Sequence, residues 1–298
     1  MRAGAGLAAG RLICRLGWLC WLLALVLAAP ARAACLSDAE VAALFAAWEN
    51  RAPAANPVLS SPADGECSRA KFNKLLQQKL GAPAGYKAGL TNPAVQRRFK
   101  YDSPVRGTLY GPMLLQDGAT VETAFGARPL FEADLLVRIS STNVNSATTP
   151  AEVLEGIDQL IPFIELPDLL VEDPAALDGV AITAINVGAR LGVTGTPLPV
   201  QATAAFNRML RDMQVIVRGD GIELDRGLGS DVLGHPLNAV IWLARDLARQ
   251  GVALQPGDLV SLGSFSRLLP PQAGLAVAVE YLGLPGNPVV TVNFRQDE

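Results

Sequence analysis

The chain has 298 residues, of which 50% are hydrophobic and 18% are charged, and its formal net charge is −3. This apolar content is enough for a large core, and the acidic balance argues against nucleic acid or an anionic membrane surface as a partner. The sequence contains one histidine, so it supports neither a Ser-His-Asp triad nor a histidine-based zinc site. It also lacks a GxGxxG or P-loop motif for a nucleotide.

Residues 1–33 have the layout of a secretory signal peptide. Three arginines accompany an apolar stretch at 16–29, and Ala31-Arg32-Ala33 forms a small-x-small cleavage signal. The apolar stretch is shorter than the roughly 20 residues that span a bilayer. The sequence therefore predicts cleavage before Ala34, export to the periplasm and no stable membrane insertion afterwards, with an uncleaved anchor as the alternative.

Two cysteines, Cys35 and Cys67, would remain after cleavage. An even number of cysteines in an oxidising compartment favours a disulfide, and these two flank the first predicted helix. We expect them to pair and to tie down the N-terminal segment. Free buried thiols are the alternative.

The N-terminal part of the chain predicts two helices. Ser37 and Glu40 form a capping box before the first helix, and the Pro/Ala/Ser-rich segment 53–65 has the composition of a linker. A second helix is expected from Ser68 to a stop at Gly81. Residues 34–80 are therefore predicted to be a small helical arm with a linker, and residues 81–298 to be the main domain.

The remaining chain predicts many strands and few helices. A capping box at 149–152 begins a short helix, Pro236 opens a longer helix that ends at Gly251, and residues 213–225 have the pattern of a hairpin. Residues 180–195 alternate loosely and are predicted to form strands, and three more short strands close the chain. This irregular mixture predicts an α+β fold with a mixed sheet.

Three carboxylates in two apolar segments are the strongest chemical signal. Glu132 and Asp134 are two residues apart on a predicted strand, so both side chains lie on one face, and Glu165 occupies a second apolar run. Buried acids need a compensating cation or proton, and oxygen donors without Cys or His suit Mg²⁺ or Mn²⁺. The alternative is three unrelated acids paired with arginines such as Arg128 or Arg138.

Several segments together resemble the fumarylacetoacetate hydrolase superfamily. They run in order over about residues 68–294, and the similarity is greatest to the branch of 2-keto-4-pentenoate hydratases and 4-oxalocrotonate decarboxylases. The matching segments are GYKAGLT (85–91), GTLYGPM (107–113), the Glu132/Asp134 strand, PFIEL (162–166), GHPLNAVIWLAR (234–245) and GDLVSLG (257–263). The resemblance implies a mixed β-roll fold, a catalytic domain at 81–298, and Mg²⁺ or Mn²⁺ held by Glu132, Asp134 and Glu165.

Other site residues follow from the resemblance. Lys87 matches the family's active-site lysine and would assist proton transfer, with a solvated lysine at a strand end as the alternative. Thr91, Asn186 and Ser264 match substrate-contacting positions, although Thr91 could instead cap a helix.

The sequence departs from the family pattern in four places. Asp134 stands where the family usually has Glu, Pro104-Val105-Arg106-Gly107 lacks the acid of the family's Pro-Asp-Phe-Gly run, Ile185 replaces the Asp of an Asp-Asn pair, and Leu262-Gly263-Ser264 replaces a Thr-Gly-Ala turn. The change at 134 shortens a metal ligand, and the others each remove a polar group expected near the substrate. His235, just before Pro236, is expected to cap or pack.

The activity implied by the resemblance is metal-dependent hydration of a small 2-keto or 2-hydroxydienoic acid through a stabilised enolate. The alternatives are a decarboxylase, a C–C hydrolase of acylpyruvates, or a periplasmic protein that binds a keto acid with little turnover. The resemblance also implies a homo-oligomer and, as the alternative to export, the cytoplasmic location of typical family members.

Overall fold

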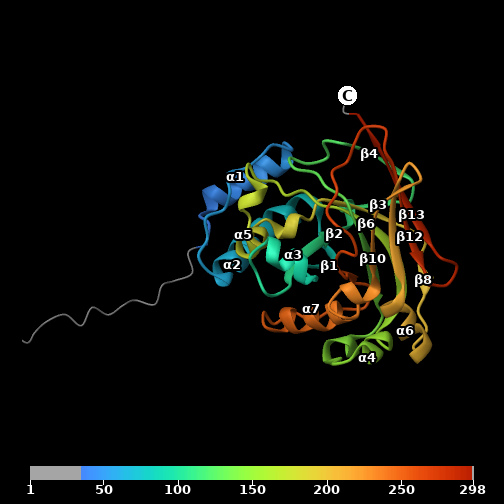
Figure 1. Ribbon diagram of the computed structural model, residues 1–298. Helices are drawn as coiled ribbons and strands as arrows, with labels where there is room; N and C mark the ends of the chain where they lie inside the picture. Colours follow the sequence, from blue (N-terminus) through green and yellow to red (C-terminus); the bar gives the residue numbers. More distant parts are fainter. Residues whose placement is uncertain (1–34, 297–298) are drawn as a thin grey trace, which may run out of the picture. The chain divides into compact units, whose positions relative to one another are not determined.

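Two β-sheets make up the centre of the fold in the computed structural model, which describes residues 35–296 (Figure 1). The larger, eight-stranded sheet has the order β2-β1-β11-β5-β6-β7-β3, with β8 paired to β6, and the five-stranded sheet has the order β10-β9-β12-β13-β4. Their strands are β1 Pro83–Gly89, β2 Val105–Tyr110, β3 Leu114–Gln116, β4 Ala119–Glu122, β5 Glu132–Ile139, β6 Ile157–Leu166, β7 Leu191–Thr194, β8 Leu198–Pro199, β9 Gln214–Gly219, β10 Ile222–Leu228, β11 Leu259–Ser261, β12 Ala276–Leu282 and β13 Val289–Arg295.

Both sheets are mixed, because parallel pairs such as β1–β11 and β4–β13 stand among antiparallel ones. The predicted α+β fold with a mixed sheet is therefore confirmed, as is the hairpin, formed by β9 and β10. Helices α1, α2, α3 and α5 gather on one side of the sheets, and α4, α6 and α7 lie below them in the view, where α7 packs against β1 (Figure 1). The helices are α1 Asp38–Glu49, α2 Pro62–Leu80, α3 Pro93–Arg98, α4 Pro150–Leu154, α5 Gly179–Ala184, α6 Ala204–Asp212 and α7 Asn238–Ala248.

Strand β5 is buried on both faces and separates two hydrophobic clusters. Ala133, Leu135 and Val137 belong to the cluster between the two sheets. Leu136 belongs to the other cluster, which includes apolar residues of α1 and α2. Side chains on a strand alternate between faces, so Glu132 and Asp134 share the face of Leu136 and point toward the helices. The period-two prediction for this strand is confirmed.

The N-terminal helices belong to the main body. Leu44 of α1 and Phe72 of α2 are buried in the same cluster as Leu136, and residues 35–296 lie within one compact unit. The predicted N-terminal helical arm therefore packs on one face of the larger sheet and shares its core. The apolar residues of its helices would be exposed to water without this packing.

Helix α2 also begins earlier than predicted, at Pro62. Ser61 is its N-cap and forms a capping box with Asp64, so the predicted linker at 53–65 overlaps the first turn of the helix. Gly65 lies against α5, and a Cβ atom at this position would be 2.7 Å from the Val180 carbonyl oxygen. Gly65, the last residue of the predicted linker, instead lets two helices pack closely.

Residues 180–184 are helical, which corrects the prediction of strands across 180–195. Asp178 is the N-cap of α5 and accepts hydrogen bonds from the backbone amides of Val180 and Ala181 at 3.0 and 2.8 Å. Almost every residue of α5 is buried. A short helix buried all round has no polar face, so its sequence shows no helical periodicity. Within the predicted range, only β7 is a strand.

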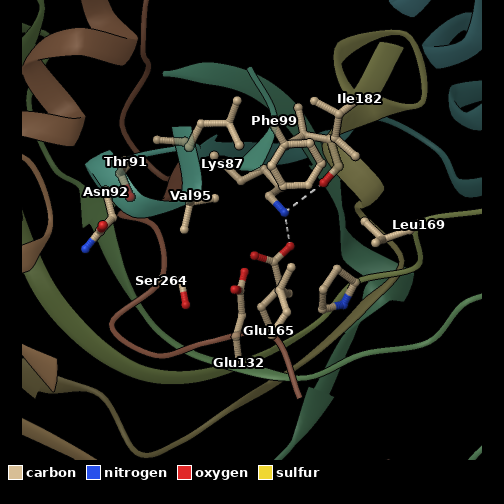
Figure 2. Close-up of a pocket in the computed structure, with 16 residues that line it drawn as sticks. Lys87, Thr91, Asn92, Val95, Phe99, Glu132, Glu165, Leu169, Ile182 and Ser264 are labelled. Atoms are coloured by element: carbon tan, nitrogen blue, oxygen red, sulfur yellow. Dashed lines mark hydrogen bonds and ion pairs between the residues drawn. The ribbon is translucent and has the colours of Figure 1, made fainter. Parts of the chain in front are cut away.

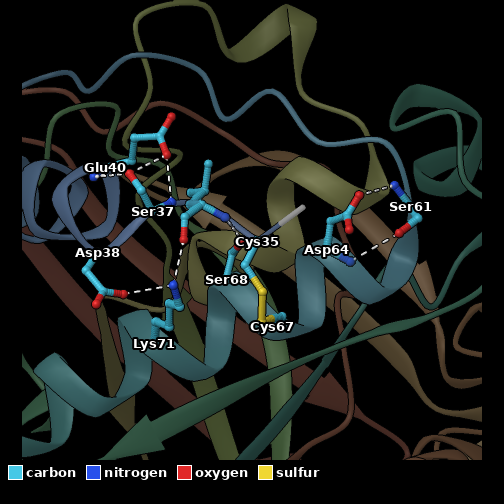
Figure 3. The surroundings of a disulfide bond; sticks show 10 residues. Cys35, Ser37, Asp38, Glu40, Ser61, Asp64, Cys67, Ser68 and Lys71 are labelled. Atoms are coloured by element: carbon cyan, nitrogen blue, oxygen red, sulfur yellow. Dashed lines mark hydrogen bonds and ion pairs between the residues drawn. A yellow bond between two sulfur atoms is a disulfide. The ribbon is translucent and has the colours of Figure 1, made fainter. Parts of the chain in front are cut away.

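Cys35 and Cys67 form a disulfide, as predicted (Figure 3). The bond ties the start of the described chain to α2, where the Leu36 amide also donates a hydrogen bond to Ser68 Oγ at 2.9 Å and Lys71 Nζ donates to the Leu36 carbonyl at 2.9 Å. The predicted signal peptide lies outside the described residues. None of the helices within 35–296 has the length and apolar character needed to cross a membrane.

Removal of the disulfide should lower the free energy of unfolding. The bond closes a loop with a sequence separation of 32 residues. In the chain-entropy model such a loop corresponds to about 3–4 kcal/mol. Urea denaturation of Cys35→Ser/Cys67→Ser should therefore show a lower midpoint than the oxidised wild type, and reduced wild type should match the double variant. Equal midpoints for all three samples would contradict a stabilising bond.

Candidate active site

The register of β5 and β6 brings two carboxylates together. These strands are antiparallel, and Glu132 is the direct cross-strand partner of Glu165. Direct partners point to the same face, with Cβ atoms about 4.5–5.5 Å apart. Both side chains line a small cavity of about 50 Å³ on the helical side of the larger sheet (Figure 2). Two like charges placed opposite each other require a compensating positive charge.

Lys87 supplies part of that compensation from β1. Its Nζ donates hydrogen bonds to Glu165 Oε1 and, at 3.0 Å, to the Val187 carbonyl oxygen. Lys87 is 3% exposed, so the alternative of a solvated lysine at a strand end is wrong. Gly107 on the neighbouring strand makes room for its stem, because a Cβ atom there would be 2.8 Å from Lys87 Cγ.

Asp134 is fully buried and does not line the cavity. One carboxylate oxygen accepts a hydrogen bond from Ser261 Oγ at 2.5 Å, and the other accepts from the amides of Leu135 at 2.5 Å and Gly263 at 3.0 Å. Asp134 therefore connects β5 to the end of β11. Its side chain, one methylene shorter than that of glutamate, is held by these hydrogen bonds and does not line the cavity that Glu132 and Glu165 line.

Burial and mutual repulsion raise the pKa values of these acids. Burial raises the pKa of Glu132 well above its ordinary value, the Glu165 carboxylate raises it further, and Lys87 partly offsets both. Burial, followed by the charge of Glu165, raises the pKa of Asp134 to about 7. The ionised site thus carries more negative charge than one lysine balances, which is the environment that attracts a cation.

The fit of this site to a metal ion rests on Glu132 and Glu165. Both present oxygen donors to one cavity, and hard divalent cations prefer such donors. Within residues 35–296, however, no group of three or more Asp, Glu, His or Cys side chains is arranged to hold an ion. The role of Asp134 as a third ligand stays a prediction.

Thr91 and Ser264 line the cavity, as the sequence predicted. Ser264 Oγ donates to the Ser266 carbonyl oxygen at 2.7 Å. The neighbour of Thr91, Asn92, also lines the cavity, and its Oδ1 accepts from the Ala94 amide at 2.8 Å as the N-cap of α3. The capping role therefore belongs to Asn92, which leaves the Thr91 hydroxyl available on the cavity wall.

The structure does not bring Asn186 to the cavity. Its side-chain amide donates to the Thr108 carbonyl at 2.9 Å and accepts from the Thr108 amide at 2.8 Å, so both ends of the amide face β2. The predicted substrate contact is corrected by these two bonds. Asn186, Val187 and Gly188 all have positive φ values, of 57°, 54° and 66°. This strained turn is stabilised by the Asn186 side chain and directs the Val187 carbonyl toward Lys87.

The sequence interpretation missed an apolar wall of the cavity. It comes from three separate segments: α3 with its C-cap, the loop after β6, and α5. Its members are Val95, Phe99, Leu169 and Ile182, and Leu268 also lines the cavity. Figure 2 shows Phe99, Ile182 and Leu169 on one side of the carboxylates, with Thr91, Asn92 and Ser264 on the other. The available sequence signal was only apolar character, which is equally typical of an ordinary core.

Two other singled-out residues lie outside the cavity. His235 is buried, its Nδ1 accepts from the Leu237 amide at 3.2 Å and its Nε2 is 3.0 Å from the Asn207 carbonyl, so it caps and packs as predicted. Arg106 is also buried, and its Nε donates to Asp246 Oδ2 at 2.6 Å. This departure from the family pattern supports a structural ion pair.

Stability of the metal-free protein should fall as pH rises from about 4 to about 7. Folded Asp134 keeps its proton up to about pH 7, whereas its ordinary pKa is 3.8. Between these values the unfolded chain binds fewer protons, so the free energy of unfolding decreases, by at most about 1.4 kcal/mol per pH unit for one group. Glu132 acts in the same direction.

Urea denaturation in a chelator at several pH values tests this expectation. Other carboxyl groups, such as those of Glu40 and Glu122, have lowered pKa values. Their contribution to the free energy of unfolding therefore increases with pH, in a window below their ordinary pKa of 4.5. Asp134→Asn keeps the volume and removes the titration, so its stability should decline less than that of wild type in the same window. A steeper decline in the variant would contradict the expectation.

The mixed sheets, the paired glutamates and the facing lysine agree with the resemblance to the fumarylacetoacetate hydrolase superfamily found in the sequence. A scan against protein-family models finds no match. Curated relatives do match: the chain is 31% identical to 2-keto-4-pentenoate hydratase 2 of Dechloromonas aromatica over 204 residues, covering 67% of this chain and 75% of that protein. It is 30% identical to 2-oxo-hept-4-ene-1,7-dioate hydratase of Escherichia coli over 205 residues, covering 66% and 74%.

The chain belongs to the 2-keto-4-pentenoate hydratase family, whose members are hydro-lyases. The fold agrees with this assignment. The solved structure of 4-oxalocrotonate decarboxylase from Pseudomonas putida G7 superposes with a TM-score of 0.74 at 24% identity, covering 87% of this chain and 98% of that one. The predicted mixed β-roll fold is therefore confirmed.

Proposed function

We propose that this protein is a metal-dependent hydratase that adds water to a short 2-hydroxydienoic acid, the enol form of a 2-keto acid. The observation that carries the proposal is the buried Lys87 facing the Glu132–Glu165 pair in one cavity. The relatives support this activity by their names, which include both a monocarboxylic and a dicarboxylic keto acid.

The cofactor is proposed to be Mg²⁺ or Mn²⁺, held by Glu132 and Glu165 with Asp134 as the third acid. Oxygen-only donors and the excess negative charge support a hard divalent cation. Neighbouring structures were solved with magnesium and adipate, with calcium and acetate, and, at a TM-score of 0.54, with Mn²⁺ and pyruvate. When bound, such an ion would polarise the 2-oxo group and offset the charge of the enolate.

The residues of the chain then determine how a proton moves. Lys87 carries its ammonium group between Glu165 and the Val187 carbonyl, so a proton is held at a fixed position beside the cavity. Hydration forms one C–O bond and one C–H bond and consumes one water molecule, so it needs no redox cofactor. Lys87 is the group that we propose to transfer the proton to carbon.

A metal-reconstitution assay tests the proposal. Purified protein is stripped with a chelator, reloaded with Mg²⁺, Mn²⁺ or no metal, and incubated with 2-hydroxypenta-2,4-dienoate while the diene absorbance and the products are followed. We expect metal-dependent loss of the diene and formation of 4-hydroxy-2-oxopentanoate. Release of carbon dioxide from 4-oxalocrotonate or cleavage of acylpyruvates in its place would favour the related reactions. Metal and keto-acid binding without turnover would instead favour the binding protein.

Asp134→Glu tests whether residue 134 is a metal ligand. Asp is one methylene shorter than the glutamate usual in the family, and its carboxylate is engaged with Ser261 and Gly263. A longer side chain should reach further toward the cavity and raise the affinity for Mn²⁺, measured by titration calorimetry. Unchanged affinity with an unchanged unfolding midpoint would show that residue 134 supports the strands and does not bind the ion.

Export to the periplasm is proposed from the layout of residues 1–33 and is supported by the Cys35–Cys67 disulfide, because such bonds persist in oxidising compartments. N-terminal sequencing of protein from the periplasmic fraction should begin at Ala34. An intact Met1 in a soluble cytoplasmic pool would contradict it. Assembly into a homo-oligomer stays a prediction.

A further inference from the structure

We infer that the site selects monocarboxylic 2-keto acids with an uncharged tail over dicarboxylic acids. The inference rests on the proposed function. It specifies the number of carboxylates on the substrate, which differs among the relatives, since they are named for acids of both kinds. The distribution of charge around the cavity carries it.

One end of the cavity suits the charged head of the substrate. Glu132, Glu165 and Lys87 meet there, and Thr91 and Ser264 add hydroxyl groups. A 2-keto acid has its carboxylate and keto oxygens on adjacent carbons, so both are accommodated at this one polar end. The tail of the acid must then lie against the remaining lining residues.

Those remaining residues offer no second positive charge. Lys87 is the one cationic side chain among the lining residues, and it already donates to Glu165 and to the Val187 carbonyl. The apolar wall on the side away from Thr91 and Ser264 consists of Phe99, Leu169 and Ile182, all almost fully buried (Figure 2). A carboxylate placed there would lose its hydration without gaining a partner.

Arg98 is a cation outside the cavity that contacts one of its wall residues. Its guanidinium carbon lies 5.3 Å from the centroid of the Phe99 ring, yet the residue is exposed and does not line the cavity. Glu132 and Glu165 would in addition repel a second carboxylate. The distribution of charge therefore favours a tail that ends in hydrogen or carbon.

The test compares two saturated acids of equal length, 2-oxopentanoate and 2-oxoglutarate, which cannot be hydrated. Titration calorimetry with the Mn²⁺-loaded protein should give a dissociation constant about 100-fold lower for 2-oxopentanoate, the scale on which an unsuitable group is rejected by an apolar pocket. The same order is expected in kcat/KM for the corresponding mono- and dicarboxylic dienes.

Adding a cation to the cavity lining should reduce the preference. Val95 is partly exposed on α3 and lines the cavity, so Val95→Lys should improve 2-oxoglutarate binding by about 10-fold and weaken 2-oxopentanoate binding. Ala94→Lys is the matched control, because Ala94 is exposed on the same helix outside the cavity lining. The control should leave the ratio of the two affinities unchanged.

The outcomes separate this inference from the proposed function. Equal or tighter binding of 2-oxoglutarate by the wild type would overturn the inference alone, and loss of that binding in Arg98→Ala would identify its partner. Failure of both acids to bind the metal-loaded protein would overturn the proposed function and the inference with it.

Discussion

Glu165→Gln should reduce metal-dependent kcat/KM by about 10³-fold or more. The substitution keeps the shape of the side chain but removes the charge that faces Glu132 across the strands and that accepts the hydrogen bond from Lys87. Metal affinity should fall because one anionic oxygen donor is lost. Steady-state kinetics and Mn²⁺ calorimetry measure the two effects separately.

Glu280→Gln is the matched control for this change. Glu280 lies on β12 and pairs with Arg218 at 2.9 Å, outside the cavity lining, so its variant should keep wild-type turnover. Circular dichroism and the unfolding midpoint establish whether Glu165→Gln is folded. A folded variant with near wild-type activity would show that Glu165 has no part in the reaction.

Lys87→Met should lower kcat by about 10²- to 10⁴-fold, the usual contribution of a positioned acid or base. In contrast to Glu165→Gln, this change should strengthen Mn²⁺ binding, because it removes a positive charge beside Glu165. Methionine keeps most of the length and the apolar character of the lysine stem, which is 3% exposed.

Opposite effects on metal affinity make the pair of variants informative. If Lys87→Met lost both turnover and metal binding, the lysine would be stabilising the cavity and would not be a proton donor. If it bound metal tightly and retained turnover, another group would have to move the proton. An unfolding midpoint near that of wild type is required in either case.

The chemical centre of the site could be predicted from the sequence, because its residues are charged within apolar segments. Glu132, Glu165 and Lys87 stand out for that reason. The position of Asn186 could not be predicted, because its direction depends on three successive residues with positive φ and on the backbone of Thr108. Spacing along a chain carries no information about such a turn.

The errors in the fold have a related cause. Ser61 and Asp64 form a capping box within a segment rich in Pro, Ala and Ser, which has the composition of a linker. Residues 179–184 form a helix with no exposed polar face, so the periodicity that identifies surface helices is missing. The apolar wall of the cavity was overlooked because its members are indistinguishable in sequence from core residues.

The parallel pairing of β1 with β11 makes the site depend on a segment near the end of the chain. Lys87 is the register partner of Ser261, and β11 lies between β1 and β5 in the sheet. The glutamates lie on β5 and β6, which are adjacent in the sheet and consecutive in sequence, whereas Lys87 takes its place in the sheet next to β11. Pairing over so long a sequence separation is slow. The lysine is therefore the part of this site whose position depends on the longest-range strand pairing.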